Sequence, residues 1–195
     1  MNASVKQAVS AQEACAPLGA TVYPEGVNFS VFSKNARSVE LLLFDDVNSA
    51  QPAKTISLDA DRHRTYHYWH VFVPGLKTGQ IYAYRAYGEF VPERGLRFDG
   101  EKVLLDPYGL GLAVPKAYNR KALKESGDIT AIAMKSVVAD PNHYDWEGDV
   151  PLKRPFAETV IYELHVRGFT CHPSSGLASE KRGTYAGLIE KIPYL

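Results

Sequence analysis

The sequence predicts a mainly β chain: a β-sandwich followed by the first βα unit of a truncated (β/α)8 barrel. Short β-prone runs, each ended by Gly, Pro, Asn or Asp, fill the first half of the chain, and no helical periodicity competes with them before Gly109. Such strand and turn spacing is typical of a sandwich rather than of a parallel sheet. After residue 158 a further β-prone run leads into apolar residues at helical spacing, which is the order of a βα unit.

Three strands are predicted in the first third of the chain. Residues 27–31 alternate apolar and polar side chains after the turn Pro24-Glu25-Gly26, as expected of a half-buried strand. Residues 39–44 contain the run Leu41-Leu42-Leu43, which indicates burial on both faces. Residues 55–58 form a short strand that leads to a charged turn.

The next two runs are predicted to pair as an antiparallel hairpin. In residues 69–73 and 81–87, successive side chains point to opposite faces of an extended strand, and aromatic residues recur on one of them. Pro74-Gly75 and Thr78-Gly79 break the chain between the two runs. We therefore expect a hairpin with a longer loop at the heart of the sandwich.

Four segments are expected along the chain. They are a disordered leader (1–16), the sandwich (17–110), a connector (111–158) and the start of the barrel (159–195). Prolines punctuate the connector, yet its apolar residues are too many for a free linker, so we expect it to lie along the surface of a larger body.

The last segment is predicted to be a strand, a loop and a helix. Residues 159–169 form the strand, Thr184 is suited to be the helix N-cap, and Leu188, Ile189 and Ile192 follow at helical spacing. A complete βα-barrel needs roughly 250 residues, so residues 159–195 can supply only its opening.

Composition narrows the choice of partners. Lys and Arg number 22 against 22 Asp and Glu, so the formal net charge is zero, which argues against nucleic acid or an anionic membrane as a partner. No apolar run reaches membrane length, and residues 1–19 lack the apolar core of a signal peptide. Two cysteines far apart favour a reducing compartment, so a cytoplasmic location is expected. Cys171-His172 has no second Cys/His pair at ligand spacing, so neither a metal nor another cofactor is expected.

Three stretches carry a family resemblance. They are Pro17–Ala20 with Gly26–Ser33, the block Trp69–Tyr108, and Val160–Thr170 with Gly183–Leu188. Together they resemble glycogen debranching enzymes of the isoamylase type, in glycoside hydrolase family 13. The resemblance implies an immunoglobulin-like N-terminal sandwich of carbohydrate-binding module family 48, followed by the first strand and helix of the catalytic barrel. In that family the barrel hydrolyses α-1,6-glucosidic branch points of glycogen or starch-like glucans with retention.

The resemblance places no catalytic residue in this chain. Retaining hydrolysis needs a nucleophilic carboxylate and a second carboxyl group about 5 Å apart, and in the family both lie on later barrel strands. The run Gly95–Asp99 mimics the family's Gly-x-Arg-x-Asp nucleophile signature, but it precedes the first barrel strand and leads into the closing motif of the sandwich. Asp99 and Asp106 are therefore predicted to be turn residues.

Contact with an α-glucan is the other chemistry to consider. Aromatic rings stack on the apolar faces of glucose, and the candidates for this role are Trp69, Tyr82, Tyr84, Phe90 and Tyr162. The alternative, which we favour for the sandwich strands, is that their aromatic residues are core or inter-domain packing. Similar stand-alone glycogen-binding modules carry Lys at the position of Ala83 and Trp at that of Phe90, so the resemblance implies weak independent binding.

Two functions stay open at this point. The first is the N-terminal portion of a debranching enzyme of glycogen catabolism, inactive by itself. The alternative is a non-enzymatic glucan-binding or regulatory module that targets a partner to polysaccharide.

Overall fold

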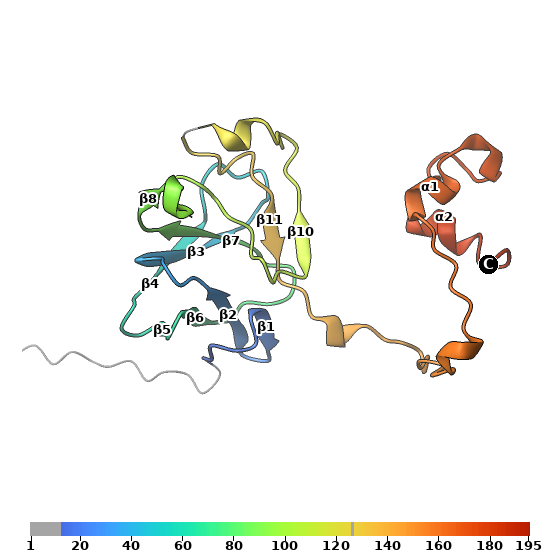
Figure 1. Cartoon of the computed structure of the whole chain (residues 1–195), viewed down its shortest axis with the longest axis horizontal. Coiled ribbons are helices and arrows are strands. Elements are labelled where there is room, and N and C mark those ends of the chain that lie inside the picture. Colours follow the sequence, from blue (N-terminus) through green and yellow to red (C-terminus); the bar gives the residue numbers. More distant parts are fainter. Residues whose placement is uncertain (1–12, 126) are drawn as a thin grey trace, which may run out of the picture. The chain divides into compact units, whose positions relative to one another are not determined.

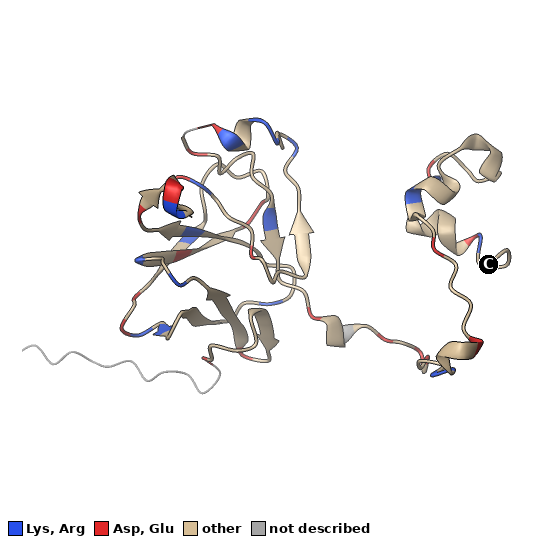
Figure 2. Ribbon diagram, in the orientation of Figure 1, with Lys and Arg blue, Asp and Glu red and all other residues tan. Residues whose placement is uncertain are grey.

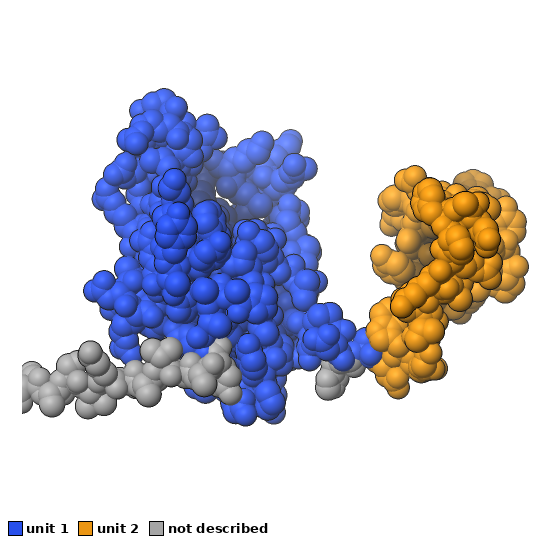
Figure 3. Space-filling model, turned by 60° about the horizontal axis from the view of Figure 1, so that its bottom comes forward, with its two compact units in different colours: residues 1–144 blue, residues 145–195 orange. Residues whose placement is uncertain are grey.

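A computed structural model describes residues 13–125 and 127–195, so residues 1–12 of the predicted leader lie outside the described residues (Figure 1). The chain divides into two compact units, residues 1–144 and 145–195 (Figure 3). The first unit is rich in strands and the second contains short helices. The prediction of a mainly β chain is confirmed.

The first unit is a sandwich of two antiparallel sheets. The four-stranded sheet has the order β1-β2-β6-β5, with β1 (Gly19–Tyr23), β2 (Gly26–Phe32), β5 (Arg64–Thr65) and β6 (Tyr68–Pro74). The five-stranded sheet has the order β10-β11-β7-β3-β4, with β3 (Ser38–Phe44), β4 (Lys54–Leu58), β7 (Ile81–Tyr87), β10 (Gly111–Ala113) and β11 (Lys135–Val137). A small hairpin joins β8 (Phe90–Val91) to β9 (Leu96–Arg97) through the 3-10 helix η1 (Pro92–Arg94), and two further 3-10 turns are η2 (Ala122–Lys124) and η3 (Pro141–His143).

Apolar residues of the two sheets meet in one core. Phe29 of β2 contacts Tyr82 of β7 edge to face, with ring centroids 4.9 Å apart. The double burial predicted from the run Leu41-Leu42-Leu43 is confirmed, because Leu41 and Leu43 join this core while Leu42 packs on the opposite face of the sheet.

The hairpin predicted for residues 69–73 and 81–87 is wrong. β6 pairs with β2 and β5, whereas β7 pairs with β3 and β11, so the two consecutive strands lie in different sheets. The loop between them crosses from one sheet to the other and takes left-handed backbone at Gly75 (φ 79°) and Gly79 (φ 94°). Placing the two strands on opposite sheets lets their apolar faces bury each other across the core, which a flat hairpin would not do.

The sandwich also extends beyond the boundary predicted at residue 110. β10 pairs with β11, and β11 pairs with β7, so part of the predicted connector belongs to the five-stranded sheet. Lys135 anchors this addition: its buried ammonium donates to the carbonyl oxygens of Val47 and Thr130 at 2.8 and 2.7 Å. Burial lowers the pKa of the Lys135 amine. Strands of three residues are too short to show a period in a sequence, which is why the connector prediction missed them.

The outer face of the five-stranded sheet is covered by the chain itself. Its cluster consists of Leu42, Phe44, Ala83, Val103, Ile129 and Ala133. The last two of these residues come from the loop that precedes β11. The first unit therefore has a third layer on this side, made of irregular chain.

The start of the described chain lies on the outer face of β2. The Asn28 amide accepts a hydrogen bond from the Ala14 backbone N–H at 3.2 Å and donates to its carbonyl at 2.9 Å. The Ser30 hydroxyl donates to the Cys15 carbonyl at 2.7 Å. Asn28 and Ser30 are thus fully buried, and the strand predicted to be half-buried is covered on both faces. Residues 13–16, predicted as part of a disordered leader, are instead held by β2.

The second unit contains no strand among residues 145–195. Its helices are η4 (Phe156–Glu158), α1 (Val166–Thr170), η5 (Pro173–Ser175) and α2 (Tyr185–Ile189). The strand predicted for residues 159–169 is not formed: residues 159–165 pair with no other segment of the described chain, and α1 follows them. A β-run without a neighbouring strand has no ladder of hydrogen bonds to hold it.

The helix predicted after Thr184 is confirmed. The Thr184 hydroxyl accepts a hydrogen bond from the Gly187 N–H at 3.1 Å, as an N-cap does. α2 is only five residues long, and Ile189 and Ile192 near its end are exposed. In the part of the chain that the structure describes, no helix is long and apolar enough to cross a membrane.

Candidate functional site

Three of the five aromatic candidates for glucan contact are core residues. Trp69 and Tyr82 are 0% exposed and Tyr84 is 4% exposed. A ring enclosed in this way has no free face for a glucose unit, so these three are corrected to packing residues, as the alternative interpretation holds. Alternation along a strand shows which side chains share a face. It does not show that this face is buried, because the burial comes from packing against the second sheet.

Trp69 is held from two directions. Its indole N–H donates to the carbonyl of Ser33 at 3.1 Å, and the guanidinium of Arg64 lies 5.0 Å from the ring centre. A buried indole needs a hydrogen-bond partner, and a cation over its face adds electrostatic attraction. Trp69 therefore fixes the end of β2 to β6.

Tyr82 forms a buried polar pair with Asp106. The Tyr82 hydroxyl donates to Oδ2 of Asp106 at 2.8 Å, and Oδ1 of Asp106 accepts the backbone N–H of Tyr108 at 2.8 Å. Burial raises the pKa of the Asp106 carboxyl. Burial and the Asp106 carboxylate raise the pKa of the Tyr82 phenol. The predicted turn role of Asp106 is confirmed, and the link to Tyr82 adds an anchor for the core.

Asp99 also stands in a turn. Its carboxylate accepts the backbone N–H of Glu101 at 3.0 Å, and its carbonyl accepts the N–H of Lys102 at 3.1 Å. These are the local bonds of an Asx turn, which explains the residue type without a catalytic role.

The other two aromatic candidates are exposed. Phe90 of β8 is 67% exposed, and Tyr162, before α1, is 63% exposed and forms an edge-to-face pair with Phe169. They lie in different units, so glucan contact remains a separate prediction for each residue. Ala83, where similar stand-alone modules carry Lys, is buried under Val103 and Ile129 of the covering layer.

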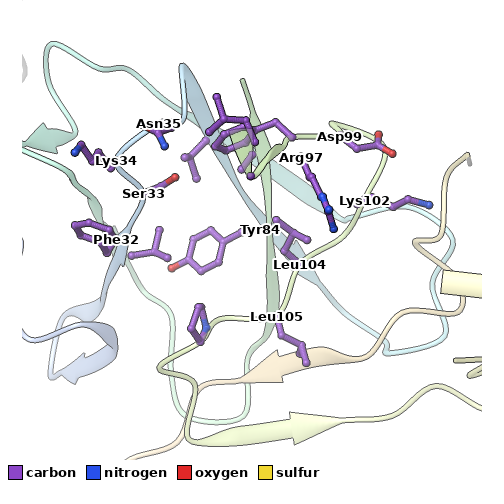
Figure 4. Close-up of a pocket in the computed structure, with 17 residues that line it drawn as sticks. Phe32, Ser33, Lys34, Asn35, Tyr84, Arg97, Asp99, Lys102, Leu104 and Leu105 are labelled. Carbon is purple, nitrogen blue, oxygen red and sulfur yellow. The ribbon is translucent and has the colours of Figure 1, made fainter. Parts of the chain in front are cut away.

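A pocket of about 490 Å³ opens in the first unit, and no sequence motif predicted it (Figure 4). Its apolar wall is formed by Val31, Val39, Phe98, Leu104, Leu105 and Pro107. Tyr84 belongs to its lining, with the hydroxyl directed toward Phe32 (Figure 4). Segments 31–35 and 95–107 meet here only because the chain folds, so neither segment by itself signals a site.

Neither basic nor acidic residues predominate in the chain. Basic and acidic residues are interspersed along the ribbon in Figure 2. Among residues 13–125 and 127–195, no group of three or more His, Cys, Asp or Glu side chains is placed to hold a metal ion.

The sequence comparisons agree with this architecture. Residues 17–109 match carbohydrate-binding module 48, described as the isoamylase N-terminal domain. The chain is 40% identical over 181 residues to Isoamylase 1, chloroplastic, of Arabidopsis thaliana, covering 92% of this chain and 23% of that protein. It is 42% identical over 178 residues to a glycogen debranching enzyme of Yersinia enterocolitica, covering 88% of this chain and 26% of that protein.

A solved structure shows the same fold. The pullulanase SAP of Group B Streptococcus aligns with a TM-score of 0.67 and 26% sequence identity, over 92% of this chain and 22% of that chain. The chain thus spans about a quarter of the length of the curated relatives it matches. Residues 17–109 match the model of carbohydrate-binding module family 48, and the resemblance of the chain to glycogen debranching enzymes of the isoamylase type is confirmed.

Proposed function

We propose that this chain is the N-terminal portion of a debranching enzyme that hydrolyses α-1,6-glucosidic linkages of glycogen or starch-like glucans. The observation that carries the proposal is the extent of the similarity. About 40% identity to isoamylase and glycogen debranching enzyme runs through roughly nine-tenths of the chain, far past the module that ends at residue 109. A module shared by unrelated enzymes would match over the sandwich alone.

In this proposal the second unit supplies the first strand and helix of a (β/α)8 barrel. Thr159 and His165 already have extended backbone dihedral angles, and the residues between them are not helical. Val160 is 94% exposed and Ile161 74% exposed, so a neighbouring strand and helix would bury a large apolar surface there. The Thr184 cap then begins the helix that follows the strand in such a unit.

The chain by itself is proposed to be inactive, because the carboxyl pair of a retaining enzyme belongs to later barrel strands. Its glucan partner is reached through the whole enzyme. The burial of Ala83 argues against the alternative, a stand-alone glucan-binding module, because similar modules carry Lys at this position and here the position is covered by Val103 and Ile129.

A chimera tests the proposal. The corresponding N-terminal part of the Yersinia enterocolitica relative is replaced by this chain, and release of reducing ends from amylopectin is measured. We expect activity in the chimera and none in the isolated 195-residue chain. A second chimera that takes only residues 1–144 from this chain serves as the matched control for the barrel segment.

Two results would contradict the proposal. The first is a folded full chimera without activity while the control chimera is active. The second is turnover by the isolated chain that disappears in an Asp99→Asn variant, because this would place the nucleophile in the sandwich.

A further inference from the structure

The pocket of Figure 4 exposes apolar surface that nothing in the described chain covers. Phe32 and Leu104 are each 44% exposed and Leu105 is 36% exposed, and all three line it. Its volume of about 490 Å³ falls within the range of roughly 300–1,000 Å³ typical of small-molecule sites. A ligand with an apolar body would remove this surface from water.

One buried polar group in the pocket lining has no hydrogen-bond partner among the described residues. The hydroxyl of Tyr84 is buried and makes no hydrogen bond to any residue that the structure describes. Buried polar atoms are nearly always satisfied, so an orphaned phenol in the lining of a cavity leaves room for an acceptor, water or ligand, that is not part of the protein. Burial also raises the pKa of this phenol, which keeps it a donor.

Three cations line the pocket, Lys34, Arg97 and Lys102, and none of them forms an ion pair with the residues that the structure describes. Figure 4 shows the side chain of Arg97, in β9, extending toward Leu104. The two other charged groups on that side are engaged elsewhere. Lys102 donates to the carbonyls of Glu125 and Gly127, and Asp99 accepts the N–H of Glu101.

We propose that this pocket binds a small organic carboxylate with an aryl or branched alkyl body. The body packs on the apolar wall, and the carboxylate pairs with the guanidinium of Arg97, whose planar fork matches it. An oligosaccharide fits less well, because its many hydroxyl groups would face aliphatic side chains. This inference is independent of the debranching proposal.

The test uses the full 195-residue chain and residue-resolved ¹H–¹⁵N NMR shifts. The probes are 3-phenylpropionate, its neutral amide 3-phenylpropanamide, and maltotriose. We expect both phenyl probes to give saturable shifts at residues 33–35, 96–99 and 104–105, with the carboxylate about three to five times tighter, the size of an exposed ion pair. Maltotriose should leave these signals unchanged.

Two variants test whether Arg97 is the residue that pairs with the carboxylate of the probe. Arg97→Gln should lower the affinity for the carboxylate to that for the amide and leave the amide unchanged. Arg94→Gln, on the exposed η1 outside the pocket lining, should alter neither. Equal affinity of the two phenyl probes in the unmodified chain, saturable shifts confined to residues 145–195, or saturation of the pocket signals by maltotriose would each overturn the proposal.

Discussion

Two tyrosines on the same face of β7 differ in one hydrogen bond. Tyr82 donates to Asp106, whereas Tyr84 has no partner among the described residues. Tyr82→Phe should therefore lower the free energy of unfolding by about 1–3 kcal/mol, because it leaves a buried carboxylate short of a donor. Tyr84→Phe, the matched control, should stay within about 0.5 kcal/mol or gain stability. Urea unfolding measures both, and equal losses would contradict the assignment.

Asp106 should make stability depend on pH. Its pKa is raised above the unfolded value of about 4, so between the two values the folded state binds more protons than the unfolded state. The stability from this group is complete below the unfolded pKa and is lost as pH rises through the folded pKa. Asp106→Asn does not titrate, so its unfolding free energy should improve relative to the unmodified chain from about pH 4 to about pH 7. If the difference in unfolding free energy between the variant and the unmodified chain did not change with pH, the raised pKa of Asp106 would be refuted.

At the scale of the element, the contact between residues 13–15 and β2 is the one most open to test. Asn28→Ala removes both hydrogen bonds to Ala14 and should cost about 1–2 kcal/mol in unfolding free energy. The amide of Ala14 should then exchange with solvent quickly, as hydrogen exchange followed by NMR would show. Ser30→Ala keeps the Asn28 pair and should leave that amide protected; loss of protection in both variants would count against a specific role for Asn28.

Elements with a visible period could be predicted from the sequence, and pairings between distant segments could not. Residues 27–31 alternate over enough positions to be recognised as a strand, the run Leu41-Leu42-Leu43 indicates burial on both faces, and Thr184 is a local signal. Alternation does not say which sheet a strand joins, so β7 was assigned to the wrong neighbour. The burial of Trp69 and the pocket lined by Tyr84 both depend on segments far apart in the chain, and no local sequence pattern encodes how such segments meet.

At the scale of the whole molecule, the boundary of the first unit can be tested by truncation. A chain of residues 13–144 should melt in one cooperative transition. A chain of residues 13–110 lacks β10, β11 and part of the layer over Leu42 and Phe44, so it should melt more than about 10 °C lower or precipitate. Circular dichroism follows both melts, and equal melting temperatures would restore the boundary at 110.

The first part of the second unit should be the first site of proteolysis. Residues 145–163 are exposed throughout and contain regular structure only in η4. Brief digestion with trypsin should cut after Lys153 or Arg154 and leave the first unit intact, as mass spectrometry would show. First cuts near η2, which carries Lys121 and Lys124 at its ends, would indicate that the covering layer opens more easily than residues 145–163.

The crossing of residues 75–80 from one sheet to the other also has a consequence for folding during synthesis. Each sheet pairs strands that are far apart in sequence: β2 with β6, β3 with β7, and β7 with β11. Neither sheet can therefore close as a local hairpin, and the five-stranded sheet stays incomplete until residue 137 has left the ribosome. At roughly 5–20 residues per second the nascent chain spends several seconds with the edge of β7 unpaired, so this strand is where a chaperone would bind it.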